Sequence, residues 1–256
     1  MDTSPKVLTE DHKIPTYFVD FEQKITIPSL LLLLQEAAWR QATQYQFGYR
    51  HLREKGLFWV LAKIKLSLFR YPKWTETLRL ETWSKEPERL TAYRDFEGFD
   101  EQGQRCFAAT SAWHILSAAT NRPQPLDDFK NRFPVPQGRH AIEEKPAKIQ
   151  APENPATIAA ATVRPSDVDL HRHVNNTRYV QWVLDGFPFD FLQTHRLREI
   201  TVNFLQQAKI AEPYRVDLEA LSNLEYLAAV VRENDEKELA RMHSLWIPAN
   251  NTLPSP

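Results

Sequence analysis

The chain has the same order of predicted elements twice, on either side of a proline-rich segment at 123–155. In each copy one long helix precedes a series of strand-like runs that are separated by turn residues. The first copy has a short run at 17–23, a helix at 30–46, and strands at 58–69, 77–84, 90–99 and 106–117. The second has a strand at 157–163, a helix at 177–193, and strands at 198–206, 214–221, 225–232 and 239–247. Because roughly 100 to 200 residues make one domain, we predict domains at 1–122 and 156–256, joined by a linker at 123–155.

The periodicity within each copy indicates an α+β architecture. In the run 61–69, apolar residues alternate with Lys63, Lys65 and Ser67, as in a strand with one wet face. Ser29 can cap the helix at 30–46, which is apolar nearly all round at its start. Burial against a sheet explains such a helix better than exposure does. We therefore expect a central helix packed on an antiparallel meander.

Charge and hydropathy along the chain argue against a nucleic-acid partner and a membrane span. The chain has 32 basic and 33 acidic residues and no block of like charge, so no nucleic-acid partner is predicted. Its longest aliphatic run, 30–34, is far shorter than the ~20 residues of a membrane span. The polar start of the chain lacks the apolar stretch of a signal peptide, so we expect a cytoplasmic protein.

Cysteine and glycine usage argues against several chemistries. Cys106 is the single cysteine, so we expect no disulfide, no Cys-rich zinc site, and a buried core thiol. No glycines form a GxGxxG or GxSxG motif. Gly98 and Gly103 have P-loop spacing, but Gln104 and Arg105 follow where Lys and Ser or Thr are required. We predict no cofactor.

The polar residues at 164–182 are the candidate site. Four side chains are spaced by two, so an extended backbone would place them on one side: Asp167, Asp169, His171 and His173. The second helix follows, with Asn175 or Asn176 as N-cap and with backbone N–H groups that can stabilise an oxyanion. Carboxylate, imidazole and helix N-terminus are what acyl-transfer hydrolysis needs. Spacing alone leaves two alternatives open: a metal site of mixed nitrogen and oxygen ligands, and simple capping.

The run SDVDLHRHVNNTRYVQW at 166–182 resembles the signature SDxDxNxHVNNxxYxxW of the acyl-ACP thioesterases of plants and bacteria. The runs FEQKITIPSLLLLLQEAA, FWVLAKIKLSLFRYPKWTETLRLETW and AATSAWHILSAATNRP are similar, in the same order, to the first domain of that family. The resemblance implies a tandem (double) hotdog, in which each central helix is wrapped by a curved antiparallel sheet. It also implies hydrolysis of fatty acyl thioesters of acyl carrier protein, with the acyl chain linked to phosphopantetheine.

The resemblance implies site residues position by position. The matching positions are Asp169, His173, Asn175 and Asn176. His171 stands where the signature has Asn, and Gln207 and Ala208 stand where many members have Glu or Glu-Cys. We therefore hypothesise that Asp169 activates water or attacks the thioester, that His171 or His173 orients the reactants, and that Gln207 holds the water. The N–H groups that would polarise the carbonyl are those of Val174, Asn175 and Asn176.

The first hotdog is implied to hold most of the acyl tunnel. Its candidate lining residues are Leu34, Trp39 and Trp59, for which ordinary core packing is the alternative. Tyr179 and Trp182, three apart on the second helix, are predicted core anchors.

Three other functions stay open at this point. A non-catalytic hotdog that binds acyl chains or acyl carriers is suggested by His171 and Gln207. An acyl-CoA thioesterase and a metal-dependent hydrolase are the others. Because the duplication supplies the pairing that single hotdogs obtain by dimerising, we expect a monomer or a homodimer.

Overall fold

The computed structural model describes residues 6–170, 172–251 and 253. The chain divides into two compact units, the first ending at Pro146 and the second beginning at Ala147. This boundary falls inside the proline-rich segment 123–155, and each part of that segment packs on its own unit. Leu126 and Phe129 are buried in a hydrophobic cluster of the first unit. In the second unit, the backbone N–H of buried Ile149 donates to the side chain of Asn203.

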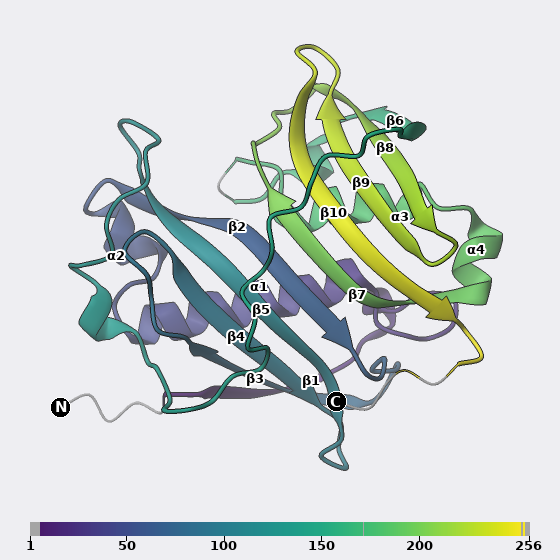
Figure 1. The fold of residues 1–256 in the computed structure, drawn as a ribbon. Helices are drawn as coiled ribbons and strands as arrows, with labels where there is room; N and C mark the ends of the chain where they lie inside the picture. Colours follow the sequence, from purple (N-terminus) through teal and green to yellow (C-terminus); the bar gives the residue numbers. More distant parts are fainter. Residues whose placement is uncertain (1–5, 171, 252, 254–256) are drawn as a thin grey trace. The chain divides into compact units, whose positions relative to one another are not determined.

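The first unit is a five-stranded antiparallel sheet with helices. Its elements are β1 (Leu8–Lys13), α1 (Ile27–Gln44), α2 (Tyr49–Arg53), β2 (Leu57–Leu68), β3 (Thr77–Ser84), β4 (Ala92–Phe99) and β5 (Arg105–Ser117). The strands lie in the order β1-β3-β4-β5-β2, and α1 lies along one face of them (Figure 1). The predicted helix and four strands are confirmed, with small changes at their ends. β1 was not predicted because its sequence, LTEDHK, has too few apolar residues to show an alternation.

The helix α1 begins before the predicted cap. Thr26 is the N-cap, and its hydroxyl accepts a hydrogen bond from the Ser29 N–H at 3.2 Å. The prediction that Ser29 caps the helix is therefore wrong. Pro28 explains the difference, because proline fits the first turn of a helix, where its missing N–H costs nothing. Ser29 instead lies inside that turn.

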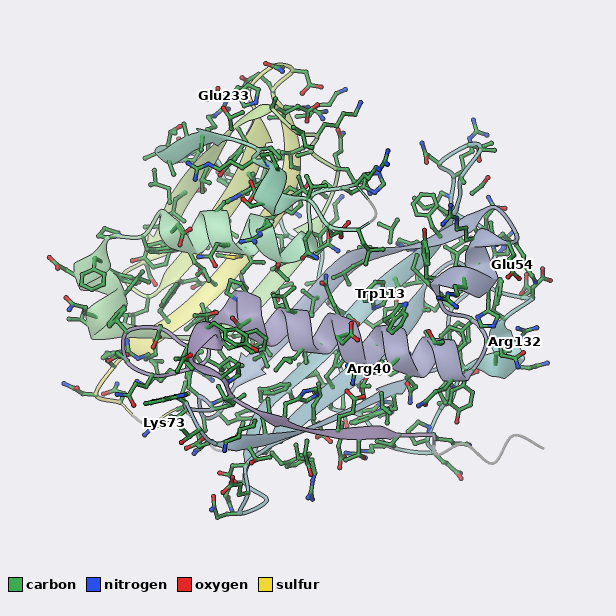
Figure 2. All side chains as sticks on the ribbon, turned by 180° about the vertical axis from the view of Figure 1, so that it is seen from behind. Arg40, Glu54, Lys73, Trp113, Arg132 and Glu233 are labelled. Atoms are coloured by element: carbon green, nitrogen blue, oxygen red, sulfur yellow. The ribbon has the colours of Figure 1, made fainter. Side chains whose placement is uncertain are left out.

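The buried face of α1 carries most of its apolar residues. Leu30 and Leu34 are at most 1% exposed, as the nearly all-round apolar start predicts. The opposite side bears Leu32, Trp39 and Arg40, which are exposed. Figure 2 shows Arg40 on this outer side, where its guanidinium pairs with carboxylates on α1 and β1. The first unit is thus a helix with one face on a sheet.

A second layer covers the other face of β4. Nearly the whole of β4 is buried. Arg94 faces α1, where it donates to Gln41, and the next residue, Asp95, faces the segment 139–145. The Asp95 carboxylate accepts the Ala141 N–H at 2.8 Å, and Arg139 pairs with Glu97. The Arg139 guanidinium also lies 3.9 Å from the ring centroid of Trp83. This segment gives the sheet a cover that its sequence, which has no periodicity, did not reveal.

Cys106 on β5 has the predicted core position. Its side chain is fully buried, and burial raises the pKa of the thiol to about 11. A thiol with that pKa is protonated near neutral pH and is a poor nucleophile.

The second unit repeats the architecture. Its elements are β6 (Ala156–Thr162), α3 (Asn176–Asp185), α4 (Phe189–Thr194), β7 (His195–Phe204), β8 (Pro213–Ser222), β9 (Glu225–Arg232) and β10 (Lys237–Pro248). The antiparallel order is β7-β10-β9-β8-β6, with α3 on one face (Figure 1). Tyr179 and Trp182 are buried in this interface, and the Trp182 ring stacks on Tyr214 at 3.9 Å. Both units therefore have the hotdog arrangement that the resemblance implies.

The helix predicted at 177–193 is two helices. α3 ends at Asp185 with Gly186 as its C-cap, and α4 begins after Pro188. Proline has no N–H to continue the ladder, and it disfavours helical backbone in the residue before it. A Cβ on Gly186 would lie 2.4 Å from the Ile158 side chain, so glycine also permits a close approach to β6.

Candidate active site

A tight hairpin brings Asp169 and His173 together. Val168 and Val174 form an antiparallel bridge, and the Asp169 N–H donates to the His173 carbonyl at 2.9 Å. Arg172 turns the chain with a φ of 61°. Asp169 is half-buried, whereas His173 is exposed. The sequence put these residues in one extended run, and that prediction is wrong because the backbone reverses between them.

The other two residues of the alternating run are His171 and Asp167. His171 lies outside the described residues. Asp167 belongs to a 3₁₀ turn, Pro165–Asp167, and is 8% exposed. Its carboxylate accepts the Arg164 N–H at 2.8 Å and lies 3.8 Å from the Arg178 guanidinium. Asp167 therefore holds the turn in place, which leaves Asp169 as the carboxylate at the hairpin loop.

The hairpin leads directly into the N-terminus of α3. Asn175 is the N-cap, and its side-chain oxygen accepts the Thr177 N–H at 3.0 Å and the Thr177 hydroxyl at 2.8 Å. The Asn175 N–H donates to the Asp167 carbonyl at 2.9 Å. In the described part of the chain, the N–H groups of Val174 and Asn176 have no acceptor. Of the three N–H groups predicted for an oxyanion, that of Asn175 is already bonded to a backbone carbonyl, and the other two have no acceptor among the described residues.

The loop after β7 brings Gln207 to α3. The Ala208 N–H donates to the Tyr179 hydroxyl at 2.9 Å, one helical turn after the N-cap. The Gln207 side chain is exposed, while Ala208 is buried. The loop also contacts the residue after β6, because the Ala211 N–H donates to the Val163 carbonyl at 3.1 Å. The loop after β7 is thus bonded both to α3 and to the segment that leads into the hairpin.

Sequence reasoning missed the second role of Tyr179. Its ring is in the core as predicted, but its hydroxyl also holds the Gln207 loop. A buried tyrosine usually has a hydrogen-bond partner for its hydroxyl. That rule was the available signal, although the sequence does not identify the partner.

The three predicted acyl-pocket residues have different surroundings in the first unit. Leu34 is buried under the sheet. Trp59 is half-buried on β2, donates to the Phe47 carbonyl at 2.8 Å, and packs against Phe133. Trp39 is 49% exposed on the outer side of α1. Their lining of an acyl tunnel stays a prediction.

Within 6–170, 172–251 and 253, no three His, Cys, Asp or Glu side chains are grouped so that they could hold a metal ion. Within the same ranges, no helix has the length and apolar character needed to cross a membrane.

Comparisons with known proteins cover both units. The family model for the acyl-ACP thioesterase N-terminal domain matches residues 5–131, and that for the C-terminal domain matches 150–247. Oleoyl-acyl carrier protein thioesterases 2 and 1 of Arabidopsis thaliana are 29% and 30% identical over 77% and 78% of this chain. The chain spans 58% and 60% of their lengths. The crystal structure of an acyl-ACP thioesterase from Bacteroides thetaiotaomicron is similar with a TM-score of 0.88 and 25% identity, covering 94% of this chain and 98% of that one.

Proposed function

The chain belongs to the acyl-ACP thioesterase family, and from this we propose that it hydrolyses fatty acyl-ACP thioesters to free fatty acid and holo-ACP. The observation that carries the proposal is the meeting of Asp169, His173 and the N-terminus of α3 within a family motif. The named relatives act on oleoyl-acyl carrier protein, so oleoyl-ACP is the first substrate to test. The first unit would hold the acyl chain and the second the thioester.

Asp169 is the proposed general base. Its carboxylate takes a proton from water as the water oxygen attacks the thioester carbonyl carbon. The N–H groups of Val174 and Asn176, which have no acceptor among the described residues, then donate to the developing oxyanion. The positive end of α3 adds to this stabilisation. When the carbonyl re-forms, the C–S bond breaks, and the leaving thiolate takes up a proton from Asp169 or solvent.

Gln207 and a histidine complete the proposed site. Gln207, held near α3 by its neighbour Ala208, would orient the attacking water through its side-chain amide. His173, whose backbone pairs with Asp169, would orient the substrate, and His171 is the other candidate. Direct attack of Asp169 on the thioester stays open, with water then cleaving the acyl-enzyme anhydride.

The test compares turnover of oleoyl-ACP by wild type and Asp169→Asn, with free thiol detected by a thiol reagent. We expect kcat to fall about 10²- to 10⁴-fold in Asp169→Asn, the usual contribution of a general base. Asp185→Asn is the matched control, because Asp185 lies at the other end of α3, where it accepts from Gln181. Near wild-type turnover by folded Asp169→Asn would remove the assignment of Asp169.

The alternative functions give different results in the same assay. A protein that only binds acyl carriers would release no thiol even as wild type; Gln207, where many members have Glu, favours this second candidate. Assays with oleoyl-CoA beside oleoyl-ACP separate the two carriers. The cytoplasmic location and the monomeric or homodimeric state stay predictions, for cell fractionation and size-exclusion chromatography to test.

A further inference from the structure

The peptide group between Gln207 and Ala208 is held from both sides. Its N–H donates to the Tyr179 hydroxyl at 2.9 Å. Its carbonyl oxygen accepts from the Arg232 guanidinium at 3.4 Å. Tyr179 comes from α3 and Arg232 from the end of β9, so two separate elements hold one peptide plane.

Each of the two side chains is itself firmly placed. Tyr179 is 3% exposed and packs edge-on against Trp182 and Phe204, with ring centroids 5.1 and 6.1 Å away. Burial raises the pKa of Tyr179 to about 12, so its hydroxyl is neutral at ordinary pH. The Arg232 guanidinium pairs with Asp235 at 2.8 Å and with Glu212 at 3.3 Å. Tyr179 is therefore placed by packing, and Arg232 by ion pairs with two carboxylates.

The loop around Gln207 is held by hydrogen bonds rather than by burial of its side chains. The side chains from Leu205 to Gln207 are exposed, and burial resumes only at Ala208. A third bond supports the same stretch, because the Arg232 guanidinium also donates to the Gln206 side-chain oxygen at 3.1 Å. The orientation of the Gln207 side chain therefore depends on the backbone that follows it. The backbone before Gln207 is held as well, because the Gln206 N–H donates to the Leu239 carbonyl at 3.1 Å. Bonds on both sides of Gln207 narrow its φ and ψ, and with them the direction of its Cα–Cβ bond.

We propose that Tyr179 and Arg232 are positioning residues that hold Gln207 for catalysis at the N-terminal end of α3. This inference rests on the proposed function, in which Gln207 orients the attacking water. A neutral amide acts only through directed hydrogen bonds, so its effect depends on position more steeply than the effect of a charge does. A displacement of about 1 Å at a reacting group can cost about 10²-fold in rate.

The main test is a double-mutant cycle with Tyr179→Phe and Gln207→Ala, measured as kcat and KM for oleoyl-ACP. Tyr179→Phe keeps the ring contacts and removes the acceptor of the Ala208 N–H. We expect kcat to fall about 10- to 100-fold with KM changed by less than about twofold. In the Gln207→Ala background, the same change should lower kcat by less than about twofold, because the residue it positions is gone.

Control variants distinguish positioning from general loss of structure. Tyr226→Phe removes a comparable hydroxyl-to-backbone bond, to the Asn223 carbonyl at 3.1 Å, remote in sequence from this loop. It should leave kcat unchanged. Arg232→Lys keeps the charge but loses the planar guanidinium with its several N–H donors. It should lower kcat in the wild-type background and have little effect on kcat in the Gln207→Ala background. Amide exchange at Ala208 should speed up in Tyr179→Phe and not in Tyr226→Phe.

The outcomes separate this inference from the proposed function. If wild type releases no thiol from acyl-ACP, the proposed function fails and the catalytic role of the two residues fails with it. If wild type is active but Tyr179→Phe leaves kcat unchanged, the positioning inference alone is overturned. An equal fall in kcat in both backgrounds would also overturn it, because the effect would not pass through Gln207.

Discussion

Gln41 on α1 accepts a hydrogen bond from the buried guanidinium of Arg94 on β4. Arg94 also donates to the Thr82 hydroxyl at 3.1 Å, and the Gln41 amide donates to the carbonyls of Lys6 and Thr82 at 3.0 and 3.1 Å. Burial lowers the pKa of Arg94, since a charge is costly in this environment. One neutral side chain thus supplies the acceptor for a buried cation and ties α1 to the sheet.

Replacing Gln41 should therefore destabilise the first unit. We expect Gln41→Leu to lower the free energy of unfolding by about 3 kcal/mol, because it removes one of the two acceptors of a buried charge and leaves the Thr82 hydroxyl as the other. Urea denaturation measures the change. Gln44→Leu, an exposed substitution of the same kind on the same helix, should cost less than about 0.5 kcal/mol. Equal stability of the two variants would contradict the role given to Gln41.

Substitution of His173 isolates the imidazole, because its bond with Asp169 involves only the backbone. His173→Ala should lower kcat for oleoyl-ACP by about 10²-fold if the ring orients the reactants. Its unfolding free energy should change by less than about 0.5 kcal/mol, since the side chain is exposed. The control is His140→Ala, an exposed histidine of the first unit. Unchanged kcat in His173→Ala would leave His171 as the candidate.

Loss of the α3 cap should reduce both stability and activity. Asn175→Ala removes the acceptor of the Thr177 N–H and hydroxyl, which should cost about 1 kcal/mol of unfolding free energy. The helix start should also loosen, so that kcat falls. Asn175→Asp keeps an acceptor and should retain wild-type stability in thermal denaturation. Equal losses of stability in the two variants would contradict the assignment of Asn175 as the N-cap.

Alkaline pH should destabilise the fold through buried tyrosines. Burial raises the pKa of Tyr93, Tyr179 and Tyr214 to about 12. The unfolded chain loses these protons near pH 10, whereas the folded chain keeps them. Their contribution to stability is therefore complete below about pH 10 and is lost as the pH rises toward about 12.

Urea denaturation at a series of pH values above neutrality would measure this loss. Tyr214→Phe should make the alkaline decline shallower, because one raised pKa is removed. Tyr17→Phe should not, because Tyr17 is 80% exposed. A decline of the same slope in Tyr214→Phe and wild type would show that Tyr214 does not contribute to it.

The local pattern was enough to locate most elements. Strands such as β3 and β9 occupy the residues that alternation and turn chemistry predict, because those signals lie within a few neighbouring residues. Where two local signals competed, the prediction failed. Ser29 and Thr26 can both cap α1, and Pro28 decided between them. Pro188 outweighed the apolar pattern that continued across it and divided the second helix.

The motif at 166–182 specified the residue types of the site, two candidates for the N-cap of α3, and the family. Its geometry was decided by the tertiary structure. The alternation of Asp and His suggested one extended face, but the bridge between Val168 and Val174 reverses the backbone and puts Asp169 opposite His173. Asp167, which the spacing makes equivalent to Asp169, is instead committed to Arg164 and Arg178.

What the sequence by itself determined is the order of the elements, their duplication and the kinds of side chain in the site. Only the tertiary structure decided that Gln207 lies at α3, that the segment 139–145 covers β4, and which N–H groups stay open. The reason is physical: periodicity and capping depend on residues a few positions apart, whereas the bond between Tyr179 and Ala208 joins residues that meet only once the sheet packs on its helix.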